Sequence, residues 1–144
     1  MKKFPLAVDC FTKCISCDPT ISDAWKRRGQ VRTAQGELVE SLNDLNQAIK
    51  LNSKDADAYM QRGLTYQITK DFQLALNDFR QIVVNNSSFE KNAMLLNYIG
   101  MCEAQLGNLD VSISHYTKAL EIDPDYKEAA MNLAQMRKVQ YSII

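Results

Sequence analysis

The segment GELVESLNDLNQAIKLNS (36–53) decides the fold, because three other parts of the chain repeat its pattern. These parts are KKFPLAVDCFTKCISCDP (2–19), KDFQLALNDFRQIVVNNS (70–87) and GNLDVSISHYTKALEIDP (107–124). The four segments align without a gap, and each carries apolar residues at steps of four, three and four positions. That spacing places the apolar residues on one stripe of an α-helix. The pattern therefore predicts four amphipathic helices of the same kind.

A second family of segments alternates with the first along the chain. Its members are SDAWKRRGQVRTAQ (22–35), ADAYMQRGLTYQIT (56–69) and NAMLLNYIGMCEAQL (92–106). Each has a glycine in the same column: Gly29, Gly63 and Gly100. Glycine in a helix interior costs about 1 kcal/mol relative to alanine. Glycines in register therefore indicate positions where a neighbouring helix approaches the backbone closely.

This pattern resembles the tetratricopeptide repeat, a unit of two antiparallel helices and 34 residues. Gly29 and Gly63 are 34 residues apart, and the 37 residues between Gly63 and Gly100 place three extra residues in NNSSFEKN (85–92). The resemblance implies an all-α fold, a right-handed superhelical array of antiparallel helix pairs (a TPR solenoid). Four positions depart from the usual repeat pattern: Arg32 and Glu103 replace an aromatic residue, and Ser41 and Ser112 replace an alanine.

The repeats divide the predicted single domain (1–144) into five parts. These are the second helix of a truncated repeat (2–19), three repeats (22–53, 56–87 and 92–124) and a terminal helix (127–141). The opening helix would leave the stripe of Phe4, Val8 and Phe11 without a partner. Either further repeats precede this piece, or another chain covers that face. Both readings make this edge a candidate for self-association.

Composition argues against several classes of function. The 17 basic residues equal the 17 acidic ones, so no net field favours nucleic acid or acidic membranes. No apolar run approaches the ~20 residues of a membrane span. No phosphate-binding loop or catalytic motif occurs, so we expect a protein that is not an enzyme and has no cofactor.

The four cysteines raise the question of a metal site. Cys10, Cys14 and Cys17 are spaced to face one side of a helix. A structural zinc site usually takes four ligands, and the only histidine, His115, is distant in the sequence. We therefore expect no metal, and reduced cysteines in a cytoplasmic or nuclear protein.

Two Arg–Asp pairs recur with the same spacing. Arg28 and Asp44 are sixteen residues apart, as are Arg62 and Asp78. In the next repeat the same positions hold Ile99 and His115, so both charges disappear together. This correlation favours structural salt bridges, because an unpaired buried charge is costly. The alternative is acid–base chemistry by Asp44 or Asp78.

If the resemblance holds, the first helix of each repeat lines a concave groove that takes extended peptides. The candidate groove residues are Lys26, Gln30, Met60, Leu64, Gln67, Met94, Asn97, Met101, Met131 and Gln135. Methionine is common on surfaces that adapt to several partners, although some of these methionines can equally fill the core between helices. Of the five residues that family members use to clamp a chaperone's C-terminal carboxylate, only Lys26 has a match. We therefore expect an uncharged, partly apolar peptide and no chaperone-tail clamp.

The predicted function is a scaffold or adaptor that binds a partner peptide or helix. The alternative is a structural segment that forms homo-oligomers through its incomplete edges. SDAWKRRGQVRTAQGE (22–37) and QRGLTYQITKDF (61–72) also resemble the repeats of the family of the plant immune regulator suppressor of rps4-RLD. That resemblance implies one part of a larger regulatory protein.

Overall fold

A computed structural model describes residues 4–143, with side chains from residue 6 to residue 142. This part of the chain contains eight α-helices, one 3-10 helix and no strand, as expected for an all-α repeat fold. The helices are α1 (Phe4–Cys17), α2 (Ser22–Gln35), α3 (Leu38–Leu51), α4 (Ala56–Ile68), α5 (Phe72–Asn85), η1 (Ser87–Lys91), α6 (Ala93–Gln105), α7 (Leu109–Ile122) and α8 (Lys127–Ile143).

The helices form two compact units, Met1–Lys70 with α1 to α4 and Asp71–Ile144 with α5 to α8. We call them unit 1 and unit 2. In repeat proteins each helix packs only on its neighbours, so the chain has no single hydrophobic core shared by all helices. The division falls between α4 and α5, inside the repeat predicted over 56–87.

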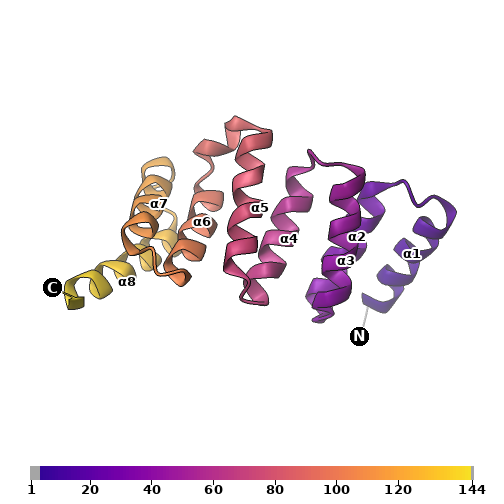
Figure 1. Ribbon diagram of the computed structural model, residues 1–144, viewed down its shortest axis with the longest axis horizontal. Helices are drawn as coiled ribbons and strands as arrows, with labels where there is room; N and C mark the ends of the chain where they lie inside the picture. The colour runs from indigo at the N-terminus through magenta and orange to yellow at the C-terminus, as the bar shows by residue number, and fades with distance from the viewer. Residues whose placement is uncertain (1–3, 144) are drawn as a thin grey trace. The chain divides into compact units, whose positions relative to one another are not determined.

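In unit 1, α2 packs against α3, α1 packs on α2, and α4 follows on α3 (Figure 1). A Cβ atom on Gly29 would lie 2.9 Å from Leu45 Cγ and 3.2 Å from the carbonyl oxygen of Ser41. This confirms that the glycine permits close approach of α3. The Ser41 hydroxyl lies 2.8 Å from the Gly29 carbonyl oxygen and can donate to it. Serine therefore replaces alanine here because it adds a bond between the paired helices.

In unit 2, α6 packs against α7, and α8 packs on α7 and α6 (Figure 1). The 85–92 connection, which contains the three extra residues, forms η1, and η1 lies against α5 and α6. Asparagine side chains cap both helices at this point. Asn86 accepts from the Ser88 N–H at 3.0 Å, and Asn92 accepts from the Leu95 N–H at 2.9 Å.

The core of unit 2 is built on aromatic residues. The rings of Phe79 and Tyr98 stack with centroids 5.6 Å apart, and Phe79 is fully buried. Tyr116 is 2% exposed, and a Cβ atom on Gly100 would lie 2.7 Å from its ring. Gly100 is therefore the place where α6 makes room for the ring of α7.

Burial of Tyr116 makes stability depend on alkaline pH. Desolvation raises the pKa of Tyr116 from 10.0 to about 12, with smaller contributions from Cys102 and Glu128. The unfolded chain releases this proton near pH 10 while the folded chain keeps it, so stability falls as pH rises between these values. We expect the free energy of unfolding to fall by about 1 kcal/mol more in the wild type than in Tyr116→Phe between pH 9 and 11. Urea denaturation at a series of pH values measures the free energy of unfolding of each protein. The same dependence of that free energy on pH in both proteins would contradict the prediction.

Candidate functional site

The first helices of successive repeats lie against each other within each unit. In unit 1, α2 contacts α4, and in unit 2, α6 contacts α8. Side-chain bonds cross both contacts: Lys26 Nζ lies 2.9 Å from Asp55 Oδ2, and the Asn132 amide donates to Asn97 Oδ1 at 3.0 Å. Each unit thus has one surface formed by alternate helices. We call these surfaces the α2–α4 face and the α6–α8 face.

On the α2–α4 face, Lys26 is only 8% exposed and is held by three carboxylates. Its ammonium lies 2.9 Å from Asp55, 3.1 Å from Asp23 and 3.3 Å from Asp57. Burial alone lowers the pKa of Lys26, but hydrogen bonds to Asp55, Asp23 and Asp57 outweigh it and raise that pKa. The charge of Lys26 is therefore balanced by carboxylates of the protein itself, and its predicted role as a ligand contact stays a prediction.

The other predicted residues of this face remain accessible. Gln30 is exposed, and Met60, Leu64 and Gln67 are half-buried. The face therefore combines partly covered apolar side chains with a local excess of acidic groups.

The α6–α8 face carries the most exposed methionines. Met94 is 45% exposed, Met131 is 72% exposed, and Gln135 is also exposed. Met101 is half-buried, with its sulfur 3.7 Å from the Asn97 amide nitrogen. Met94 and Met131 are thus surface residues that a partner could contact, whereas Met101 also packs between the helices, so each of the two predicted roles applies to some of the methionines.

Asn97, which was predicted to line the groove, is completely buried. Its amide lies 3.3 Å from the Tyr126 hydroxyl, and its carbonyl oxygen accepts from Asn132. The side chain is used to join α6 to α8 and to the Tyr126 turn. Asn97 therefore holds together the helices that form the α6–α8 face, and its own side chain is not part of the accessible surface.

The structure brings Arg28 and Asp44 together as a bidentate pair. Arg28 Nε and Nη2 donate to the two carboxylate oxygens of Asp44 at 2.9 and 2.8 Å. Arg32 adds a third bond of 2.8 Å, so the arginine in the aromatic column is a second partner of the same carboxylate. The Asp44 carboxylate thus accepts three bonds from two arginines, which favours the structural role over the catalytic alternative.

The second predicted pair would join the two units. Within unit 1, Arg62 donates to Asn46 Oδ1 at 2.8 Å, and its guanidinium lies over the rings of Tyr59 and Tyr66. Asp78 belongs to unit 2 and is buried there. Its pairing with Arg62 stays a prediction.

Sequence reasoning missed an ion pair in unit 2. Glu103 is 2% exposed, and its two oxygens accept from Arg80 Nη2 and the Asn108 amide, both at 2.7 Å. The signal was present, because Glu103 occupies a column where the repeat expects an aromatic side chain. Such a replacement in a buried column requires a partner for the charge.

The N-terminal edge is described only in part, whereas all four cysteines are described and are free thiols. Val8 and Phe11 are half-buried, and the Phe4 side chain lies outside the described residues.

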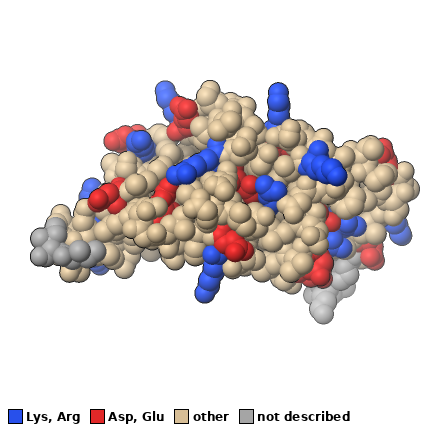
Figure 2. Space-filling view, in the orientation of Figure 1, with Lys and Arg blue, Asp and Glu red and all other residues tan. Residues whose placement is uncertain are grey.

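Among the side chains that the structure describes, no three His, Cys, Asp or Glu residues are placed to hold a metal ion. No helix in the described chain is long and apolar enough to cross a membrane. Lys and Arg side chains are scattered among Asp and Glu on the face shown in Figure 2, where most of the surface is uncharged.

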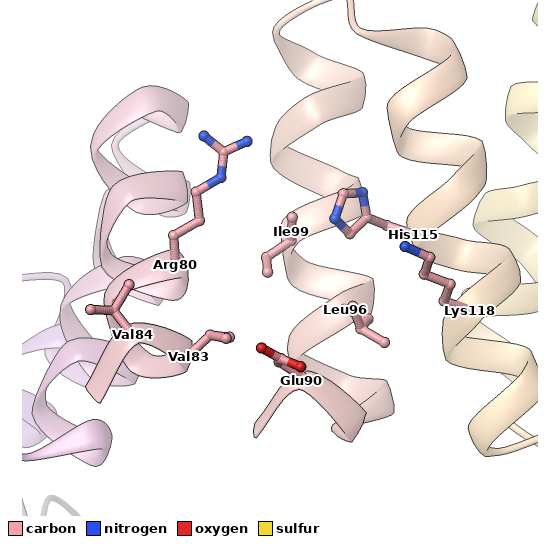
Figure 3. Close-up of a pocket in the computed structure, with 8 residues that line it drawn as sticks. All are labelled: Arg80, Val83, Val84, Glu90, Leu96, Ile99, His115 and Lys118. Carbon is pink, nitrogen blue, oxygen red and sulfur yellow. The ribbon is translucent and has the colours of Figure 1, made fainter. Parts of the chain in front are cut away.

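A pocket that the sequence did not predict lies in unit 2, with a volume of about 460 Å³. Figure 3 shows its lining residues, which come from α5, η1, α6 and α7. They are Arg80, Val83, Val84, Glu90, Leu96, Ile99, His115 and Lys118. None of them belongs to the predicted groove.

Comparison with known families agrees with this geometry. Residues 29–68 match the TPR repeat family, and residues 56–83 and 93–126 match tetratricopeptide repeat families. The chain is a tetratricopeptide-repeat domain. None of these matches indicates a catalytic family.

Two curated proteins illustrate the similarity of this TPR domain in sequence. Tetratricopeptide repeat protein 13 of Homo sapiens is 30% identical over 135 residues, which is 94% of this chain and 15% of that protein. Heat shock protein STI1 of Saccharomyces cerevisiae is 33% identical over 114 residues, 74% of this chain and 19% of that protein. The chain thus spans less than a fifth of the length of either relative.

Solved structures share the TPR fold at low sequence identity. MamA superposes with a TM-score of 0.87 at 19% identity, covering 95% of this chain and 78% of MamA. The first TPR of Spaghetti bound to the HSP90 peptide SRMEEVD has a TM-score of 0.76 at 19% identity, covering 83% of this chain and 93% of that one. At these identities the likeness establishes the fold alone.

Proposed function

We propose that this TPR domain is a protein-interaction module that holds an extended, partly apolar segment of a partner polypeptide. The observation that carries the proposal is the exposure of Met94 and Met131 on the α6–α8 face. Flexible, polarizable methionines at a surface suit contact with varied apolar side chains. A TPR structure with a bound peptide among the similar folds supports this general mode of action.

The chemistry of the α2–α4 face argues against a carboxylate clamp. Three aspartates surround the one ammonium of Lys26, so the local charge is negative. The peptide SRMEEVD, bound by the similar TPR structure, ends in acidic residues that such a cluster repels. We therefore propose that the preferred segment has little negative charge and does not end in a captured carboxylate.

Replacing Met94 and Met131 together by glutamate tests the binding face. We expect partner binding to weaken at least tenfold, about 1.4 kcal/mol, because two carboxylates would be desolvated against an apolar ligand. The immobilised chain captures proteins from cell extract, mass spectrometry identifies those enriched, and titration of the captured partner gives the affinity.

The matched control places two glutamates at equally exposed apolar sites on second helices. Val39 on α3 is 69% exposed and Val111 on α7 is 44% exposed, against 72% and 45% for the two methionines. The Val39→Glu, Val111→Glu variant should retain the partner. Equal binding by both double variants would place the interaction elsewhere, and tight binding of SRMEEVD that is lost in Lys26→Met would overturn the proposed ligand class.

Self-association is the competing function, favoured by the exposure of the apolar Leu6 on α1, the helix that also carries Val8 and Phe11. Sedimentation of the wild-type chain and of Leu6→Glu separates the two functions. A monomer at high concentration excludes self-assembly, whereas an oligomer that dissociates in Leu6→Glu supports it. We also propose a regulatory role, which the resemblance to the plant family implies, and a location in the cytoplasm or nucleus, where the cysteines stay reduced.

A further inference from the structure

The pocket of unit 2 lies where another repeat holds an arginine. In unit 1 the guanidinium of Arg28 fills the space between α1 and α3. It donates to the Thr12 hydroxyl on α1 at 3.0 Å and to the Asp44 carboxylate on α3 at 2.8 Å. The slot between successive second helices is therefore occupied there by a long side chain of the intervening first helix.

The repeat register gives the counterparts of these three residues in unit 2. Ile99 precedes Gly100 as Arg28 precedes Gly29. Arg80 on α5 and His115 on α7 take the places of Thr12 and Asp44. Because the isoleucine side chain is much shorter than arginine, the slot remains open and forms the pocket of about 460 Å³.

The floor of this pocket is apolar. Leu96 and Ile99 of α6 lie between Val83 and Val84 of α5 on one side and α7 on the other (Figure 3). Val84 is largely exposed to solvent. The floor is suited to the aliphatic side chain of a ligand, because its burial there removes apolar surface from water on both sides.

The rim is mainly cationic where the first repeat has a carboxylate. His115 Nδ1 lies 2.8 Å from the Val111 carbonyl oxygen, which can only accept, so Nδ1 donates this bond and Nε2 of the neutral ring is an acceptor. Lys118 is exposed one turn further along α7. Arg80 gives one N–H group to Glu103 and has further donors, while Glu90 is the acidic lining residue, on η1.

We propose that this pocket binds an acidic–apolar peptide segment of a partner protein. An aliphatic side chain rests on the Leu96–Ile99 floor, and an adjacent Glu or Asp carboxylate meets Lys118 and Arg80. The complementary charge fixes the direction of the segment, and the floor supplies the apolar contact.

This docking surface is separate from the α6–α8 face. Successive helix residues are rotated by about 100°, which places Leu96 and Ile99 on the side of α6 opposite to Met94 and Met101. The pocket can therefore be occupied whether or not the α6–α8 face holds a partner, and it prefers a ligand of different charge.

Fluorescence anisotropy with a labelled peptide tests the proposal. The probe is a short acetylated and amidated peptide with a central Leu-Glu-Leu sequence, and its counterpart carries Lys in place of Glu. We expect saturable binding of the Glu peptide, weakened at least tenfold by Lys118→Glu and by high salt. Lys138→Glu on α8, also at an exposed lysine of unit 2, should leave binding unchanged.

A second variant tests the pocket without relying on surface charge. The Ile99→Arg, His115→Asp double variant rebuilds the pair formed by Arg28 and Asp44, so it should fold and fill the slot with its own guanidinium. Binding of the Glu peptide should be abolished, while thermal unfolding shows that the fold is retained. The Met94→Glu, Met131→Glu variant should bind the probe like wild type.

Three results would overturn the proposal: failure of the wild-type chain to bind the Glu peptide, equal binding of the Lys peptide, or binding that survives in the folded double variant. Loss of binding in the Met94→Glu, Met131→Glu variant alone would assign the probe to the α6–α8 face instead. The two surfaces can thus fail independently.

Discussion

Replacing Asp44 by asparagine is expected to lower the free energy of unfolding by about 3–5 kcal/mol, the range observed when one partner of a buried ion pair is removed. The Asp44 carboxylate is 2% exposed and accepts bonds from both Arg28 and Arg32. Asparagine keeps the shape of the side chain but removes the charge and one acceptor oxygen. The Arg28 guanidinium would then lie in a poorly solvated site without a counterion, while Arg32 keeps a longer ion pair with Glu37, with its Nε 3.8 Å from Oε2.

Urea denaturation of the isolated chain measures this loss through the change in midpoint and slope. Glu103→Gln is the internal comparison, since it changes another buried carboxylate to its amide. Its arginine partner, Arg80, is 56% exposed at the side chain and can be hydrated when the pair is broken. We expect that variant to lose less, about 1–3 kcal/mol for a buried hydrogen-bonded group.

A compensating variant separates the cost of unpaired charge from the loss of a specific contact. Replacing Arg28 by Met, Arg32 by Leu and Asp44 by Leu removes the whole cluster with side chains of suitable volume. Such replacements are often neutral or stabilising, so we expect most of the stability lost in Asp44→Asn to return. If Asp44→Asn costs less than 1 kcal/mol, or the triple variant is as unstable as the single one, the cluster is not the charge-balanced structural element proposed here.

The repeat columns predicted much of this fold because they depend on backbone geometry. Gly29 and Gly100 each mark a point where an added Cβ would collide with the partner helix, and a sequence shows such a restriction directly. The Arg28–Asp44 pair could be predicted from the sequence for a related reason. Two charges that are present together and absent together across repeats have a common structural cause.

The candidate site was harder to predict, because aligning the repeats does not show which side chains of one repeat contact those of the next. Lys26 matches a ligand-binding position in the repeat, yet Asp55 and Asp57, at the start of the next first helix, form ion pairs with it. The acids belong to the following repeat, so an alignment of columns keeps them apart from the lysine that they contact. Asn97 is similar, since its partners Tyr126 and Asn132 lie beyond its own helix pair.

The pocket required the structure for a different reason. The sequence showed that Ile99 and His115 replace an Arg–Asp pair, but a shorter side chain can be compensated by closer packing of the helices. The structure shows that the helices leave space instead. Whether a deletion of side-chain volume closes or opens a site depends on how the surrounding helices relax.

The second large effect is expected from Gly100→Ala, which should lower the free energy of unfolding by about 2 kcal/mol. Alanine alone would stabilise the helix by about 1 kcal/mol, and overpacking opposes this with as much as about 3 kcal/mol. The added Cβ would lie 2.7 Å from Tyr116 Cε1, 3.0 Å from Cδ1 and 3.1 Å from Cζ. The ring is planar, rigid and almost fully buried, so it cannot turn aside as an exposed side chain would.

A double-mutant cycle with Tyr116→Leu decides whether the ring causes this loss. Leucine at position 116 is destabilising by itself, because it leaves part of the ring volume empty. In that background the alanine methyl has space, so its helix propensity should make Gly100→Ala neutral or mildly stabilising. The cycle should therefore give a favourable coupling of at least about 1 kcal/mol between the two substitutions. Additive losses would show that the backbone of α7, and not the Tyr116 ring, requires glycine at this position.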